Sequence, residues 1–346
     1  MAVGFFLMDG FDDMANTAYR YTYADTVFNA STNTPFNYGR SLDFSASADS
    51  KISTPVGTAT AVFVHFWMKT YGAADLNENV RLEFYDSYAG QMQIDIRLKS
   101  NKITDSVDFL VYRGGSTLIQ TWSVPRVRLG FWNNIGVKVT LDPSSGVVVL
   151  LVDGKSYFQF TGNTMGTPNL NIDLVRLRTI GVSGRVLIDD LIIGSGASGD
   201  PALSMLRVFG ANVPVSAAAA QWTPSAGSNW QTVDEIPPDD SDYNYSATSG
   251  QIDLFSHGPL PSTLQSVSAV QPRARCWVPE SGNSDQIYMM LQSSGINTSA
   301  SSLVVYNNNA TNAYQSMRTV FHYDPATSAS WTPSAAAAAY FGYKKY

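Results

Sequence analysis

Apolar and polar residues alternate in short runs along the first part of the chain. The clearest run is QMQIDIRLK, from Gln91 to Lys99, in which every second side chain is apolar. Strict alternation gives a strand one buried face and one wet face. Similar runs recur at close spacing, separated by Gly, Pro, Asn, Asp and Ser: AVFVHFWMK, DFLVYR, STLIQTWSV, IGVKVTL, GVVVLLVDGK and GRVLIDDLIIG. Many short strands with almost no helical periodicity predict an antiparallel jelly-roll sandwich over residues 1–196.

The strand pattern is interrupted by GSGASGDPA, a small-residue stretch that ends in proline. Such a composition is typical of an interdomain linker, which we place at residues 197–202. Short apolar runs resume after it and predict a second, smaller β-sandwich-like domain over residues 203–346. The chain is therefore expected to be all-β, with two domains and one short helix near the C-terminal end of the sequence.

Two features of the first domain serve as structural anchors in this interpretation. Trp132 precedes an alternating strand and is expected to lie in the core. Asp153 and Gly154 stand between two apolar runs, and the pair predicts a tight hairpin turn because glycine tolerates positive φ.

The word WTPSA occurs twice in the second domain, at Trp222 and at Trp331. The residues that flank the two copies differ, so WTPSA is a recurring local motif and not part of a longer repeat. Both tryptophans are expected to be buried. The first copy leads into a turn at Gly227, whereas the second meets a polyalanine run, in which Pro333 favours the start of a helix from Ser334 to about Phe341. Gly342 would end that helix, and Tyr340, Phe341 and Tyr343 would pack on the sheet or on a neighbouring subunit.

Charge is scarce and the balance is acidic. Charged residues make up 14% of the chain, and the net charge is −6. No basic stripe is visible, which argues against a nucleic-acid partner. No signal-peptide pattern and no apolar run of membrane-spanning length appear, so we expect a soluble chain, made in a cytoplasm and not inserted in a membrane.

The residue types that carry catalysis are few and scattered. The three histidines, His65, His257 and His322, lack metal-ligand spacing, and Cys276 has no neighbouring histidine. A glycosidase needs two carboxylates on one face, yet Glu83 and Asp86 have opposite strand parity. From this count the chain is expected not to be an enzyme.

Paired aspartates are the one feature of the sequence that suggests a cofactor, and that cofactor would be calcium. Asp12 and Asp13 belong to the first strand region of the first domain, and Asp189 and Asp190 belong to its last. These regions often pair in a closed sandwich, and carboxylates suit Ca²⁺. The alternative is that one aspartate of each pair faces solvent while the other caps a turn.

Residues 131–158, FWNNIGVKVTLDPSSGVVVLLVDGKSYF, resemble the concanavalin A-like or laminin-G-like jelly-roll superfamily, as do the flanking YGRSLDF and GRVLIDDLIIGSG. Residues 221–255, the AVQPRAR stretch and the terminal DPATSASWTPSAAAAAYFGYKKY are similar to C-terminal modules of tailed-bacteriophage virion proteins. The resemblance defines no catalytic or binding residue.

These resemblances imply a non-enzymatic structural protein of a phage virion: a tail, tail-tip or fibre subunit, or a capsid decoration. It would be assembled in the host bacterial cytoplasm and would dock on other virion proteins and on copies of itself. The alternative from another class is a carbohydrate-binding module of a receptor-binding protein, with a host surface glycan as its ligand.

Overall fold

The structure is a computed structural model, and it divides the chain into two compact units, residues 1–210 and 211–346. It describes residues 4–9, 29–31, 41–45, 49–101, 103–104, 106–180, 183–195, 208, 214–235, 241–262, 264–278, 284–299, 303–306 and 315–346. The linker predicted at residues 197–202 lies outside the described residues, so the separate folding of two domains stays a prediction.

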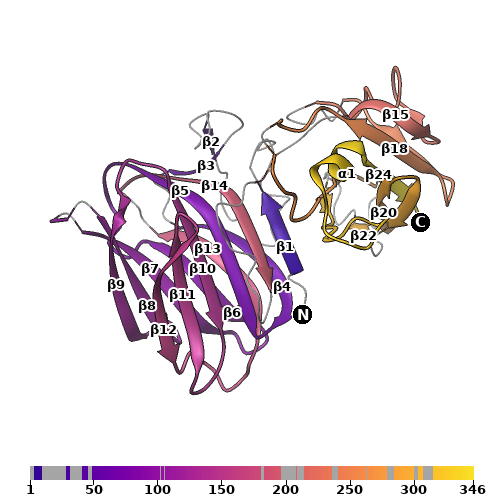
Figure 1. The fold of residues 1–346 in the computed structure, drawn as a ribbon. Helices are drawn as coiled ribbons and strands as arrows, with labels where there is room; N and C mark the ends of the chain where they lie inside the picture. Colours follow the sequence, from indigo (N-terminus) through magenta and orange to yellow (C-terminus); the bar gives the residue numbers. More distant parts are fainter. Residues whose placement is uncertain are drawn as a thin grey trace. The chain divides into compact units, whose positions relative to one another are not determined.

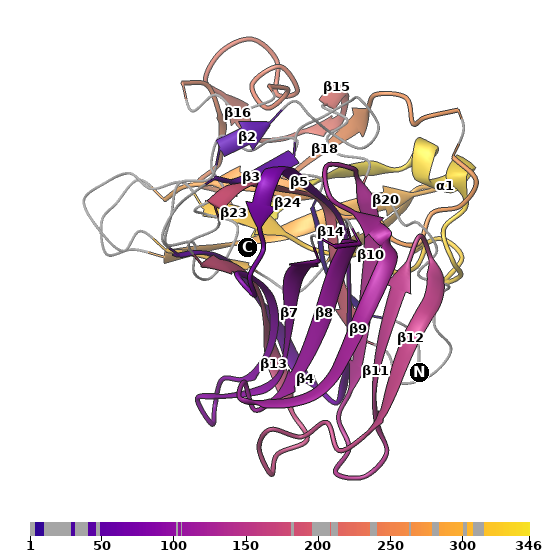
Figure 2. The ribbon, with the colours of Figure 1, turned by 90° about the vertical axis from the view of Figure 1, so that its left-hand side faces the viewer.

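The first unit contains two antiparallel sheets that lie face to face (Figures 1 and 2). The eight-stranded sheet has the order β12 (Lys155–Gly162), β11 (Gly146–Val152), β10 (Asn133–Thr140), β5 (Ala61–Asp75), β14 (Ser183–Ser195), β3 (Ser41–Ser45) and β2 (Asn29–Ser31), with β1 (Gly4–Asp9) also paired to β14. The six-stranded sheet has the order β4 (Asp49–Ala59), β13 (Ile172–Ile180), β6 (Val80–Asp86), β7 (Gln91–Asn101), β8 (Ser106–Arg113) and β9 (Thr117–Arg128). The all-β jelly-roll prediction is confirmed for this unit.

The core of the first unit lies between these sheets and follows the alternation of the sequence. In β6, for example, Leu82 and Phe84 are fully buried members of that core. Their neighbours at odd positions therefore point to the other side of the six-stranded sheet. Trp122 of β9 and Phe158 of β12 stack with ring centroids 5.8 Å apart.

The tryptophan expected in this core is a different one. Trp132 is only half-buried, because it belongs to the turn that precedes β10 rather than to a strand. Trp122, at 4% exposure, lies in the core instead. Asp153 and Gly154 form the two-residue turn between β11 and β12, with φ of 51° and 72°.

The second unit is built on a six-stranded antiparallel sheet with the order β15 (Pro214–Ala220), β18 (Ile252–His257), β24 (Tyr340–Lys345), β20 (Ser284–Ser293) and β21 (Ile296–Ser299), with β22 (Leu303–Tyr306) also paired to β20. Two small ladders join β16 (Thr223–Pro224) to β17 (Asn244–Tyr245) and β19 (Arg273–Cys276) to β23 (Gln315–Arg318). Within the described residues, α1 (Pro333–Ala338) is the one helix, and no helix there is long and apolar enough to cross a membrane.

The two WTPSA copies do diverge after their prolines. Thr332 caps α1 by accepting a hydrogen bond from the Ala335 amide, and Pro333 occupies the first helical turn. Gly227 takes a positive φ of 59° in the loop after the first copy. Trp331 is 4% exposed. Trp222, expected to be buried as well, is only half-buried.

The predicted helix ends three residues too late, and Gly342 does not end it. The chain leaves α1 after Ala338 and continues as β24, hydrogen-bonded between β18 and β20. Tyr340, Phe341 and Tyr343 are thus part of the sheet. Gly342 is not a helix stop: a Cβ there would lie 1.9 Å from the Asp253 carbonyl oxygen. The close pairing of two backbones, and not a turn, requires this glycine.

Candidate functional site

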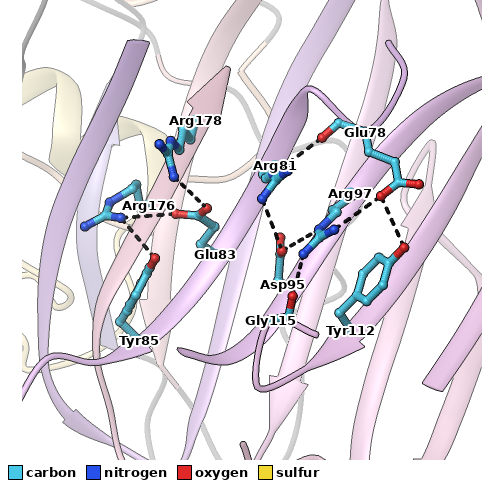
Figure 3. Close-up of polar contacts among 10 residues, drawn as sticks. All are labelled: Glu78, Arg81, Glu83, Tyr85, Asp95, Arg97, Tyr112, Gly115, Arg176 and Arg178. Atoms are coloured by element: carbon cyan, nitrogen blue, oxygen red, sulfur yellow. Dashed lines mark hydrogen bonds and ion pairs between the residues drawn. The ribbon is translucent and has the colours of Figure 1, made fainter. Parts of the chain in front are cut away.

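The face of the six-stranded sheet that points away from the core is densely charged (Figure 3). Its central residues come from five of the six strands and from the turn before β6. We call this set the charged face: Lys51, Ser53, Glu78, Arg81, Glu83, Tyr85, Asp95, Arg97, Tyr112, Arg176 and Arg178.

Cross-strand register arranges most of these side chains in two neighbouring rows. One row crosses the sheet through directly paired residues of β4, β13, β6, β7 and β8: Ser53, Arg176, Glu83, Asp95 and Tyr112. The neighbouring row lies two residues further along or back on each strand. On β4, β13, β6 and β7 it contains only cations, which are Lys51, Arg178, Arg81 and Arg97. Like charges placed directly opposite each other destabilise a sheet. A row of four cations therefore needs compensation nearby.

Glu83 provides part of that compensation. Its side chain has no exposed surface, and it lies between two arginines of β13. Arg176 Nη1 is 3.3 Å from Glu83 Oε2, and Arg178 Nη1 is 3.7 Å from Glu83 Oε1. Arg176 also donates to the hydroxyls of Tyr85 and Ser53, at 3.1 and 3.3 Å.

Asp95 has the same arrangement on the other side. Arg97 Nε donates to Asp95 Oδ2 at 2.6 Å, and Arg81 Nη1 lies 3.9 Å from the same oxygen. Burial raises the pKa of Asp95 to about 6, although both arginines lower it. Asp95 Oδ1 accepts no hydrogen bond from the described part of the chain.

Glu78 is the carboxylate at the edge of the face. It has a φ of 64°, in the left-handed region that a residue with a Cβ rarely occupies. Its Oε2 accepts hydrogen bonds from Arg97 Nη1 at 3.2 Å and Tyr112 Oη at 3.1 Å. Its carbonyl accepts one from Arg81 Nε at 3.1 Å. Strained backbone that persists under such contacts is typical of functional sites.

Two arginine–tyrosine pairs complete the face. The Arg97 guanidinium lies 3.9 Å from the centroid of the Tyr112 ring, and that of Arg176 lies 4.5 Å from the Tyr85 ring. Burial is the main cause that raises the pKa of both tyrosines, so their hydroxyls stay protonated at neutral pH. Each ring limits the rotation of its arginine.

The four arginines are partly exposed, while the two carboxylates beneath them are not. The exposed side-chain fractions are 24% for Arg81, 15% for Arg97, 19% for Arg176 and 26% for Arg178. With Lys51, the described residues of the face include five cations and three carboxylates, which are Glu78, Glu83 and Asp95. It is therefore locally positive in a chain whose net charge is −6. Fixed guanidinium groups at the surface of a sheet are suited to recognise carboxylate, sulfate or hydroxyl oxygens.

Of the carboxylates singled out from the sequence, Glu83 belongs to the charged face, whereas Asp189 and Asp190 lie in β14 of the other sheet. Asp189 Oδ1 accepts the Asp190 amide at 2.8 Å, and Asp190 Oδ1 accepts the Val208 amide at 3.1 Å. Asp12 and Asp13 lie outside the described residues. No group of three or more His, Cys, Asp or Glu side chains with metal-binding geometry occurs in the ranges that the structure describes. The calcium site stays a prediction.

The histidines and the cysteine have structural surroundings. His65 Nε2 lies 3.0 Å from Asn134 Oδ1, and burial lowers the pKa of His65 to about 4. His257 Nε2 lies 3.0 Å from the carbonyl oxygen of Ala336 in α1. Burial lowers the pKa of His322 and raises that of the Cys276 thiol to about 12, so this thiol is no nucleophile at neutral pH.

Sequence reasoning missed the charged face, although a signal for it is present. The strands RLEFYD, QIDIRLK and DLVRLRT all carry Arg, Glu or Asp at the positions that alternate with core residues. Their charges accumulate on one face only if the three strands are neighbours. That adjacency depends on the order β13-β6-β7, in which β13 is far along the sequence from the β6–β7 hairpin.

Comparison with known proteins gives the fold and nothing finer. No protein-family model matches the chain, and no curated protein does. Solved structures similar to it include an alginate lyase from Chlorella virus (10% identity, TM-score 0.35, covering 49% of this chain and 90% of that one) and an endo-1,3-β-glucanase from Streptomyces sioyaensis (10%, 0.38, 57% and 97%). The galectin LEC-6 from Caenorhabditis elegans is also similar (10%, 0.29, 44% and 94%).

The expectation that the chain is not an enzyme is corrected here. Enzymes are among the solved structures that are similar to this chain, and the argument from carboxylate spacing considered single strands only. Glu83 and Asp95 are neighbours across two strands, so two carboxylates do share a face. The first unit is thus described by its own sheets as an antiparallel jelly-roll sandwich.

Proposed function

We propose that the charged face of the six-stranded sheet binds a carbohydrate. The observation that supports this proposal is the row from Ser53 to Tyr112, in which Arg176, Glu83 and Asp95 are each held by an ion pair with a neighbouring charged side chain. A sugar presents many hydroxyl groups in a fixed geometry. Donors and acceptors that are already immobilised lose little conformational entropy when they bind such a ligand.

A fold-level analogy points the same way. Jelly rolls include lectin domains, but fold alone does not fix function. The proposal therefore depends on the side chains of the charged face and is tested on them.

The test is a glycan array followed by calorimetry, with the full chain and two matched variants. Arg176→Gln removes a donor from the face but leaves Glu83 its contact with Arg178. Arg126→Gln makes the same change away from the face, where Arg126 lies 3.7 Å from Asp153 of the β11–β12 turn. We expect the wild type to bind, Arg176→Gln to bind about tenfold more weakly and the control to be unchanged.

Two results would overturn the proposal. One is a folded chain that binds no glycan on the array. The other is glycan binding that Arg176→Gln leaves at the wild-type affinity.

Cleavage of the carbohydrate is the second candidate, because one specific observation favours it. Glu83 and Asp95 are carboxylates paired across two strands, and burial raises the pKa of Asp95 to about 6. A carboxyl group with a raised pKa beside a second carboxylate is characteristic of the general acid in glycosidases. Binding takes precedence because both carboxylates are covered by arginines. The check is an assay for new chain ends with array-positive glycans, in wild type and Asp95→Asn.

The virion setting stays a separate prediction. A glycan-binding unit joined to a second β unit suits a phage receptor-binding protein that recognises a host surface glycan, alongside docking on other virion proteins. Labelling intact particles with an antibody against this chain would test it, and the absence of label from purified particles would exclude it.

A further inference from the structure

We infer that the carbohydrate bound by the charged face is a linear acidic one, whose carboxylate or sulfate groups lie along the row Lys51, Arg178, Arg81 and Arg97. This inference rests on the proposed function and adds the ligand's charge and its direction on the sheet. It starts from the register that places these four cations side by side on four successive strands.

The row of four cations is electrostatically unfavourable within the sheet itself. Each neighbouring pair in the row places like charges opposite each other, which a sheet normally avoids. The carboxylates that offset this repulsion, Glu83 and Asp95, belong to the adjacent row and are fully covered. Their negative charge is therefore beneath the surface, while the guanidinium groups above remain partly exposed. An approaching ligand meets the cations.

The row of four cations runs across the strands, from β4 to β7. Adjacent strands lie about 4.8 Å apart, so three steps from β4 to β7 cover about 14 Å across the strands. A single small anion could contact only one or two members of such a row. A chain with repeated negative groups could contact all four. The row thus favours an oligomeric ligand that runs perpendicular to the strands.

Cations outnumber carboxylates among the described residues of the charged face. These residues include five cations and three carboxylates, in a chain with a net charge of −6. Because burial raises the pKa of Asp95 to about 6, the positive excess grows by one when this group is protonated at lower pH. Affinity for an acidic ligand should therefore increase as the pH falls from 7 to 5, provided that the ligand itself stays ionised.

A nucleic acid would also be a linear polyanion, but the chain favours a sugar. Phosphate-backbone binding normally requires a broad basic surface, and here the excess charge is confined to one sheet face in an acidic chain. The same face also holds acceptors and hydroxyls, in Glu78, Tyr85 and Tyr112, for sugar hydroxyl groups.

The experiment measures the affinity of the full chain for four probes by calorimetry, each at low and at high salt. The probes are a galacturonate hexasaccharide for the carboxylate, a sulfated dextran oligosaccharide for the sulfate, an unsulfated dextran oligosaccharide of the same length, and a short single-stranded DNA. We expect at least one acidic sugar to bind about tenfold more tightly than the neutral one, with an affinity that decreases with salt.

The variants are chosen so that each buried carboxylate keeps one arginine. Arg81→Gln leaves Asp95 with Arg97, and Arg178→Gln leaves Glu83 with Arg176. Both should weaken acidic-sugar binding about fivefold or more, whereas Arg126→Gln should change it less than about twofold. Lys51→Gln, at the end of the row, should weaken hexasaccharide binding but not disaccharide binding.

The outcomes separate this inference from the proposed function. If neutral and acidic sugars bind equally and the face variants weaken both, the inference is wrong and the proposed function stands. If no sugar binds the folded chain, both fail. DNA binding as tight as that of the acidic sugars, or equal effects of Lys51→Gln on long and short oligosaccharides, would also overturn the inference. A preference for carboxylate over sulfate, or the reverse, identifies the anionic group and supports it.

Discussion

Glu83 on β6 and Asp95 on β7 are direct cross-strand partners, and neither side chain has any exposed surface. Two carboxylates in such a position would repel each other in isolation. Each carboxylate instead forms ion pairs with two arginines. Glu83 pairs with Arg176 and Arg178 of β13, and Asp95 pairs with Arg81 of β6 and Arg97 of β7. The charged face is therefore one electrostatic unit whose members depend on each other.

This dependence is unequal for the two arginines beside Asp95. Arg97→Gln removes the 2.6 Å contact and leaves Asp95 with a guanidinium 3.9 Å away, so the first unit should lose about 3 kcal/mol or more. Arg81→Gln should cost about 1 kcal/mol or less, since the short pair remains. Denaturant-dependent hydrogen exchange of the β6 and β7 amides would measure both. Equal losses of stability in the two variants would contradict the prediction, because they would show that the 2.6 Å Arg97–Asp95 ion pair stabilises the unit no more than the 3.9 Å Arg81–Asp95 pair.

His65 predicts a pH dependence of the first unit. Its pKa is about 4 in the folded chain and about 6.5 in the unfolded chain, so between these values only the unfolded chain binds the proton. The free energy of unfolding should therefore decrease as the pH falls through this window, by about 3 kcal/mol at pH 4 from this group. Asp95 acts in the opposite sense, because its folded pKa is raised.

The contribution of His65 is isolated by difference. His65→Gln should remove this pH dependence while that of Asp95 stays, and parallel curves for the two proteins between pH 6.5 and 4 would contradict the prediction. Chemical denaturation at a series of pH values is the measurement.

The two WTPSA tryptophans should differ in their contribution to stability. Trp331 is 4% exposed, and its Nε1 donates to the Phe321 carbonyl at 3.0 Å. Trp331→Ala should cost the second unit about 3–5 kcal/mol. Trp222 is half-buried, with its ring 4.7 Å from that of Tyr343, so Trp222→Ala should cost about half as much. Thermal unfolding of the two variants side by side is the check, and the reverse order would refute the assignment.

Gly342→Ala should disrupt the second unit. The added Cβ would lie 1.9 Å from the Asp253 carbonyl oxygen, which belongs to paired backbone and cannot move away. We expect a loss of about 3 kcal/mol or more. Gly136→Ala is the matched strand control, because its closest contact is the Leu151 Cβ at 3.2 Å, which has to move by only a few tenths of an ångström. Circular dichroism and thermal unfolding would report both, and similar costs for the two would contradict the close-approach argument.

Local features of the fold could be predicted from sequence because their causes are local. The alternation in QMQIDIRLK and the turn at Asp153 and Gly154 each depend on a few adjacent residues. The end of α1 could not be predicted, because the polyalanine run favours helix while the pairing of Tyr340–Lys345 with β18 and β20 overrides that preference. Hydrogen bonds to β18 and β20 therefore determine where the helix ends.

The charged face could not be predicted for a related reason. Glu83 and Asp95 are separated by a hairpin, and Arg176 and Arg178 come from a strand far along the sequence. Their meeting depends on strand order and register, which no local pattern specifies. Trp132 was misplaced for a simpler reason: it stands next to a strand, and residues at strand entries need not face the core.

The central position of β24 has a consequence for the order of synthesis. Of the six strands in its sheet, β24 comes last in the sequence, yet it hydrogen-bonds to both β18 and β20. A nascent chain that has emerged only as far as α1 therefore has two unpaired inner edges facing an empty slot. Such edges invite pairing with other chains. A ribosome that stalls before Tyr340 would release a species prone to aggregation, and a free peptide with the β24 sequence, added in trans, could occupy the slot by strand addition.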